Sequence, residues 1–169
     1  MKRMKIKKGF TLIETLVAIT ILLISLAGPL TLAAQALKSA YYARDGITAF
    51  YLAQEGLEYV RAIRDQNYLA SPQQPWLTGI DDCVGVSCQV DFLNFSHSVC
   101  PGNACSALLV DSNGFFNAQN GASSNFTRSL TLSPVAGTSD EVTAGVTVSW
   151  VSAGISRSFT LSEDLFNWL

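Results

Sequence analysis

The chain of 169 residues lacks the histidine clusters and the sequence motifs that mark many enzymes. Histidine occurs once, as His97, so the sequence shows no companion histidine for a metal site or for Ser-His catalysis. A phosphate loop, a dinucleotide fingerprint and a nucleophile elbow are also missing. We therefore expect a protein that is not an enzyme and binds no cofactor, with His97 on the surface or in a loop.

Charged residues are scarce as well, at 14% of the chain, and basic residues are scarcest beyond the N-terminus. Five of the 11 Lys and Arg residues lie within residues 1–9, which leaves six against all 13 Asp and Glu residues. This acidic remainder gives no strong nucleic-acid signal, because nonspecific binding to nucleic acids depends on positive charge. Low charge together with abundant Ser, Thr, Asn and Gly fits an exported protein.

What the chain does have is a long apolar run, residues 10–37, directly after the basic leader at residues 1–9. The run exceeds the ~20 residues that span a bilayer, and the positive leader predicts a cytoplasmic N-terminus. A secretory signal would have a shorter apolar core and a small-residue cleavage site. Cleavage near residues 33–36 is the alternative, and it would remove the membrane segment.

Glu14 is the one charged residue between Gly9 and Ala36. An ionised carboxylate in the hydrocarbon of a bilayer is costly, so it needs a partner or a task. If the chain is cut after Gly9, the new α-amino group of Phe10 lies four residues before Glu14, on the same face of a helix. The amino group of a neighbouring copy could instead serve as the partner.

The Lys-rich leader followed by Gly9-Phe10-Thr11-Leu12-Ile13-Glu14 resembles the processing signal of type IV pilins and of the pseudopilins of type II secretion. In that family, prepilin peptidase cuts between the glycine and the phenylalanine and N-methylates the phenylalanine, here Phe10. The glutamate serves filament assembly, a role that would fall to Glu14. The resemblance implies three kinds of partner: prepilin peptidase, other pilin or pseudopilin subunits, and an inner-membrane assembly platform.

Gly28 and Pro29 lie inside the apolar run. Proline in a helix removes a hydrogen bond and clashes with the preceding turn, and transmembrane helices tolerate it as a kink. The pilin resemblance adds a second interpretation, since a Gly/Pro-bearing stretch of this helix is locally unwound in assembled pili. Both interpretations predict a helix kink or unwinding at Gly28 and Pro29.

Residues 38–70 predict an amphipathic continuation of the helix. Apolar residues recur there at three- and four-residue spacing, and charged residues such as Glu55 occupy other faces. The apolar stripe consists of Ala49, Leu52, Ala53, Gly56, Leu57, Val60 and Ile63. We expect this stripe to pack on the protein's own sheet. Glu58 with Arg61, and Arg61 with Asp65, have the spacing of ion pairs on a solvated face.

Residues 126–169 predict a three-stranded antiparallel sheet, because apolar and polar residues alternate over 126–132, 142–150 and 155–161. Residues 71–125 predict a loop-rich, cysteine-containing region whose strand order the pattern does not reveal. The expected fold class is α+β: a long N-terminal helix, with a membrane half and an amphipathic half, packed on a small antiparallel β-meander. A pilin-like architecture is also what the resemblance implies.

The four cysteines, Cys83, Cys88, Cys100 and Cys105, form two copies of Cys-x4-Cys. An even number on the exported side of a membrane argues for disulfides. Zinc bound by four thiolates is the competing interpretation, which an oxidising compartment disfavours. Three connectivities are possible. A turn over residues 101–104 favours Cys83–Cys88 with Cys100–Cys105, and we expect no metal.

Residues 111–114, Asp-Ser-Asn-Gly, could form either a turn or a cation site. Their side-chain oxygens could bind calcium, as occurs in some pseudopilins. A turn is the commoner structure for an Asp/Asn/Gly cluster of this length. We therefore predict a turn.

Two classes of function fit these features. The first is a structural subunit of a type IV pilus-like filament, in particular a minor pilin, with a type II secretion pseudopilin as the alternative. The second is a single-span, membrane-anchored binding domain that never polymerises. Only the first class needs Glu14 and the Gly9-Phe10 junction. In either class the leader is cytoplasmic and the domain is exported, in the first class to a cell-surface or periplasmic filament.

Overall fold

The computed structural model describes residues 9–152 and 154–167. The predicted leader, apart from Gly9, therefore lies outside the described residues. The chain divides into two compact units, residues 1–41 and residues 42–169. The division falls within one long helix, α1 (Leu12–Leu69), which contributes residues to both units.

In the first unit, α1 is apolar and every residue from Leu12 to Tyr41 is exposed. Among the described residues, α1 is the helix that is long and apolar enough to cross a membrane, by length and composition. The helix continues through Gly28 and Pro29. An unwound turn at these residues is therefore not present in this single copy, and unwinding within an assembled filament stays a prediction.

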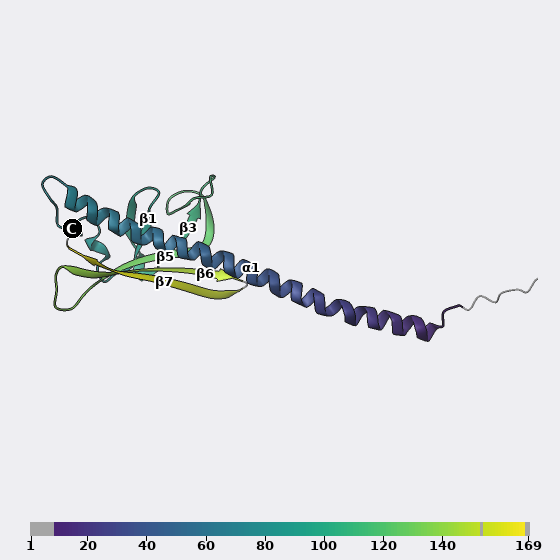
Figure 1. The fold of residues 1–169 in the computed structure, drawn as a ribbon. Helices are drawn as coiled ribbons and strands as arrows, with labels where there is room; N and C mark the ends of the chain where they lie inside the picture. Colours follow the sequence, from purple (N-terminus) through teal and green to yellow (C-terminus); the bar gives the residue numbers. More distant parts are fainter. Residues whose placement is uncertain (1–8, 153, 168–169) are drawn as a thin grey trace, which may run out of the picture. The chain divides into compact units, whose positions relative to one another are not determined.

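The second unit contains an antiparallel sheet that has seven strands within the described part of the chain. The strands run in the order β2-β1-β5-β3-β4, with β6 paired to β5 and β7 paired to β6 (Figure 1). Their bounds are β1 Cys88–Asp91, β2 Ser96–Val99, β3 Ala107–Val110, β4 Phe116–Asn117, β5 Ala122–Pro134, β6 Glu141–Ser152 and β7 Ile155–Phe166. Two short 3-10 helices, η1 (Asp81–Cys83) and η2 (Pro101–Asn103), lie in the loops.

The last three strands form an antiparallel meander. β5 pairs with β6 from Phe126 to Pro134, and β6 pairs with β7 along the whole length of β7. Alternate residues of β5 and β6 are buried, as their sequence pattern predicts. The expected fold class, an α+β arrangement of a long N-terminal helix on an antiparallel sheet, is confirmed.

The sheet is larger than the sequence pattern suggests, because four short strands from the loop-rich region join it. β1 and β3 both pair with β5. Burial does not follow the apolar-polar alternation of β1, because Gln89 and Asp91 are buried together with their apolar neighbours. Gln89 donates to the Ser106 carbonyl, and Asp91 accepts from the backbone N–H groups of Asn94 and Ala118. These internal hydrogen bonds make the polar residues tolerable in a buried strand.

The C-terminal turns of α1 lie across one face of the sheet (Figure 1). All seven residues of the predicted apolar stripe are buried there. Gly56 allows the helix to approach closely, since a Cβ at this position would lie only 2.9 Å from Cγ1 of Val146 in β6. The core is therefore the layer between the stripe and the inward residues of β5 and β6.

Candidate functional site: the N-terminal assembly segment

Thr11 caps the start of α1. The backbone N–H of Glu14 donates to Thr11 Oγ1 at 3.3 Å, and the N–H of Thr15 donates to the Thr11 carbonyl at 3.2 Å. Thr-x-x-Glu is the sequence of a capping box, so Thr11 to Glu14 defines a helix start by itself. The cap places Glu14 in the first turn of α1. There the partial positive charge of the helix N-terminus stabilises a carboxylate.

Glu14 and Phe10 are both exposed in this single copy. Among residues 9–152 and 154–167, the Glu14 carboxylate forms no ion pair. It is therefore accessible to a cation from outside the chain. After cleavage at Gly9, the α-amino group of Phe10 in the same or another copy is a cation of suitable position.

Four hydroxyl side chains of the apolar run are satisfied within the helix. The hydroxyl groups of Thr15, Thr20, Ser25 and Thr31 each donate to a backbone carbonyl three or four residues earlier. Such hydroxyls need no partner outside the helix, which suits an apolar environment. Glu14 is thus the charged side chain of this segment that has no ion-pair partner among the described residues.

The prokaryotic N-terminal methylation motif matches residues 4–28 of the chain. This motif is the type IV pilin-like signal, and it contains Gly9, Phe10 and Glu14. It supports the type IV pilin and pseudopilin class, and it implies processing by prepilin peptidase and assembly with other pilins. The signal and the apolar helix fit a membrane-anchored, exported protein. No curated protein and no solved structure gives a significant match to the chain.

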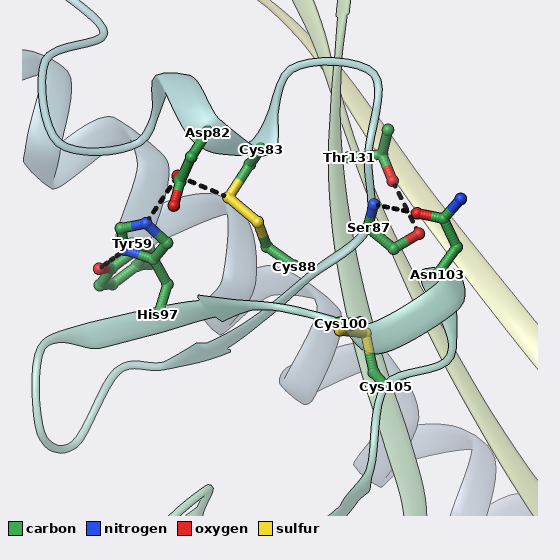
Figure 2. Close-up of a disulfide and its surroundings, with 10 residues drawn as sticks. All are labelled: Tyr59, Asp82, Cys83, Ser87, Cys88, His97, Cys100, Asn103, Cys105 and Thr131. Carbon is green, nitrogen blue, oxygen red and sulfur yellow. Dashed lines mark hydrogen bonds and ion pairs between the residues drawn. A yellow bond between two sulfur atoms is a disulfide. The ribbon is translucent and has the colours of Figure 1, made fainter.

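The second unit contains two disulfides, Cys83–Cys88 and Cys100–Cys105 (Figure 2). The first joins η1 to the start of β1. The second closes a turn in which Gly102 has a φ of 59°, in the left-handed region that glycine adopts without strain. Asp82 lies near the first disulfide. The sulfur atoms of Cys83 and Cys88 are bonded to each other, so they are not thiolates that could bind a metal.

His97 is half-buried, with 16% of its side chain exposed, and it lies in strand β2 and not in a loop. Its Nδ1 atom lies 3.0 Å from the Tyr59 hydroxyl of α1, and its Nε2 atom lies 2.9 Å from Asp82 in η1 (Figure 2). The ring therefore connects the helix, the sheet and the disulfide-bearing loop. A lone histidine in sequence gives no signal for this role, because its partners are 38 and 15 residues away.

The environment of Tyr59 favours its neutral form. Burial raises the pKa of the Tyr59 hydroxyl, and the negative charges of Asp82 and Asp91 raise it further. A neutral hydroxyl can donate to Nδ1 of His97, whereas a tyrosinate cannot. Tyr59 therefore contributes a neutral hydroxyl to the contact between α1 and β2 at ordinary pH.

Arg128 of β5 is the main feature that sequence reasoning missed. It occupies an inward position between Phe126 and Leu130 and is 0% exposed. Its guanidinium donates to the Leu52 carbonyl at 3.1 Å and to Glu55 at 2.8 Å, both in α1, and to the Val90 carbonyl of β1 at 2.6 Å. One side chain thus links the helix, the meander and the strand from the loop-rich region.

The charged face of α1 is accordingly less solvated than predicted. Glu55 is the partner of Arg128, with 28% of its side chain exposed. Arg61 pairs with Glu58, as predicted, but its second partner is Glu163 of β7 and not Asp65. The helical spacing identified Glu58 as a partner of Arg61, but it could not reveal the carboxylate of Glu163 on the sheet.

Asp111 forms the predicted turn. Its Oδ1 atom accepts hydrogen bonds from the backbone N–H groups of Asn113 and Phe115, at 2.8 and 2.9 Å. The bond from Phe115, together with contacts from Asn113 and Gly114, lowers the pKa of the Asp111 carboxyl. The charge of Asp111 is thus stabilised by backbone N–H groups of the chain itself.

Proposed function

We propose that the chain is a minor pilin: a structural, non-enzymatic subunit of a type IV pilus-like filament. Prepilin peptidase removes residues 1–9 and methylates the amino group of Phe10. The N-terminal half of α1 then enters the filament from the membrane. The observation that carries the proposal is the methylation motif together with Glu14, placed in the first turn of an otherwise apolar, exposed helix.

The carboxylate of Glu14 favours assembly into a filament over simple anchoring in the membrane. A membrane anchor gains nothing from a carboxylate in its apolar segment, because its burial in hydrocarbon is costly. In a bundle of helices, the Phe10 amine of another subunit can neutralise it. The disulfide-bearing, irregular region between α1 and β5 supports a specialised subunit over the repeating one.

The first experiment determines the N-terminus of the chain from its native host by mass spectrometry. The proposal predicts a chain that begins at Phe10 and carries one methyl group on its amino terminus. A chain that begins at Met1, or near Gln35, would contradict it.

The second experiment compares Glu14→Ala with Thr15→Ala in filaments sheared from cells. Glu14→Ala leaves the neighbour's amine without a counter-charge, at a cost on the order of 3–5 kcal/mol, so we expect at least tenfold less of it in the filament fraction. Thr15→Ala removes a hydroxyl that bonds within its own helix, so it should assemble like the wild type. Both variants should insert into the membrane and be processed normally.

Equal incorporation of Glu14→Ala and the wild type would reject the assembly role and favour the membrane-anchored binding domain. The pseudopilin alternative is tested by the machinery required. Incorporation that depends on a type II secretion assembly platform, and not on a pilus platform, would replace the minor pilin with a pseudopilin.

A further inference from the structure

The inference concerns β7, the strand at one edge of the sheet (Figure 1). Within the described residues, β7 pairs with β6 alone, in an uninterrupted register from Ile155 to Phe166. The strand has 12 residues, whereas the edge strands β2 and β4 have four and two. A long, regular edge without proline or a bulge is a template for pairing with another strand.

We propose that β7 strands from two copies of this chain pair antiparallel, about a two-fold axis at Thr160. The sequence of β7 is self-complementary in this register. Directly opposite residues would be Ile155 and Leu165, Ser156 and Asp164, Arg157 and Glu163, Ser158 and Ser162, Phe159 and Leu161, and Thr160 with itself. Opposite charges, apolar pairs and hydroxyl pairs at opposed positions all stabilise antiparallel strands.

The neighbouring registers lack this match. A two-fold axis at Phe159 would place Arg157 opposite Leu161, and an axis at Leu161 would place Phe159 opposite Glu163. Each of these registers sets a charged side chain against an apolar one. A two-fold axis at an intermediate position would pair residues that point to opposite faces of the sheet. The charge pattern therefore selects Thr160 as the centre.

The inward face of the β7 edge is incompletely covered in a single copy. Phe159 and Leu161 pack against the core but are only partly buried, whereas Leu165 is fully buried. Opposed Phe159 and Leu161 side chains would cover each other in the pair. The continuous sheet would thus remove apolar surface from water, which favours association.

Arg157 and Glu163, which would form the ion pairs in this register, are already held in place along the edge. The Arg157 guanidinium lies over the Tyr42 ring, 5.2 Å from its centroid, and Glu163 pairs with Arg61. A carboxylate has about four acceptor positions, so Glu163 can accept from Arg61 and from the second copy's Arg157. Fixed positions reduce the entropy lost when the ion pairs form.

A two-fold axis reverses the direction of every strand, and with it the direction of the part of α1 that lies on the sheet. The contact therefore cannot join parallel neighbours within one filament. It links copies whose domains run in opposite directions, such as domains of two adjacent filaments. It does not require Glu14, so its failure and the failure of filament assembly can be distinguished.

Single cysteines test the register in the purified full chain in detergent, with a short bismaleimide as cross-linker. Thr160→Cys should give a cross-linked dimer, because the two positions are opposed at the axis. The matched control is Ser149→Cys, which is exposed on the same face of the sheet but lies in β6. The control should cross-link at least tenfold more slowly.

A mixture of two single-cysteine variants tests the register at positions other than Thr160. Ser158→Cys should cross-link to Ser162→Cys but not to itself, because two Ser158 positions would lie four residues apart along the strands, ~13 Å. Arg157→Glu in the Thr160→Cys chain sets two carboxylates together and should slow cross-linking at least tenfold. Equal rates for Thr160→Cys and Ser149→Cys, self-linking of Ser158→Cys, or no effect of Arg157→Glu would each overturn the proposal.

Discussion

The two halves of α1 differ in where their apolar side chains lie. From Leu12 to Tyr41 the helix is apolar on every side, fully exposed, and bonds its own hydroxyl groups. From Tyr42 to Leu69 it has one apolar stripe, which the sheet covers. A helix that is apolar all round needs an apolar environment, whereas an amphipathic helix needs one partner surface.

The position of charge follows this difference. The first half has one acidic residue, Glu14, which has no ion-pair partner among the described residues. In the second half, Glu55 and Arg61 have partners on β5 and β7 of the same chain. Substitutions in the second half should therefore affect the folding of the exported domain and leave the processing of the first half unchanged.

The largest effect in the domain is expected from Arg128→Met. This variant keeps most of the side-chain volume but leaves Glu55 and two buried carbonyl groups without their donor, so it should destabilise the domain by about 3 kcal/mol. Arg61→Met is the matched control and should cost at most about 1 kcal/mol, because Arg61 is partly exposed. Denaturant unfolding measures both. Equal losses would show that burial of Arg128 does not determine its contribution.

Removal of the Cys83–Cys88 disulfide should have the next largest effect. Chain entropy predicts a loss of about 2 kcal/mol for a loop of this length. The Cys100→Ala/Cys105→Ala double variant opens a loop of equal length but removes less buried sulfur, since Cys83 and Cys88 are both fully buried. We therefore expect a larger shift of the unfolding midpoint for Cys83→Ala/Cys88→Ala. A reversed order would contradict this interpretation, and processing at Gly9 should be normal in both.

Glycine substitutions compare crowded and open parts of α1 directly. Gly56→Ala places a Cβ 2.9 Å from Val146 and should destabilise the domain by about 1–3 kcal/mol. Gly46→Ala meets no described atom within 4 Å and should stabilise the helix by roughly 0.5–1 kcal/mol. Thermal unfolding of both variants tests the close packing at Gly56. A neutral Gly56→Ala would mean that the helix can move away from β6 at little cost.

Apart from the control variants, the smallest loss of stability is expected from Tyr59→Phe, which should cost about 1 kcal/mol near neutral pH through the lost hydrogen bond to His97. Because the pKa of Tyr59 is raised in the folded state, its contribution is complete below the ordinary tyrosine pKa, about 10. It is lost as the pH rises from there through the raised pKa. Unfolding measured from pH 9 to 12 should therefore show a steeper alkaline loss for the wild type than for Tyr59→Phe. Parallel curves would contradict the role of burial at Tyr59.

Local patterns predicted much of this molecule. The stripe from Ala49 to Ile63 and the alternation in β5 and β6 identified their buried faces, because period and burial are linked directly in helices and strands. The polar residues in the core followed no such rule. Arg128 sits where the alternation requires an apolar side chain, and Asp91 and His97 depend on partners from distant segments.

The sequence by itself determined the N-terminal segment: its leader, the Gly9-Phe10 junction, the Thr11 cap, Glu14 and the apolar helix all act through neighbours within a few residues. Only the tertiary structure decided the polar interior of the second unit, the four short strands that extend the sheet, and the position of β7 at the edge of the sheet. The physical reason is the range of the interactions. Capping and helix periodicity act over one or two turns, whereas burial of a charge is tolerable only when folding brings its partners from far along the chain.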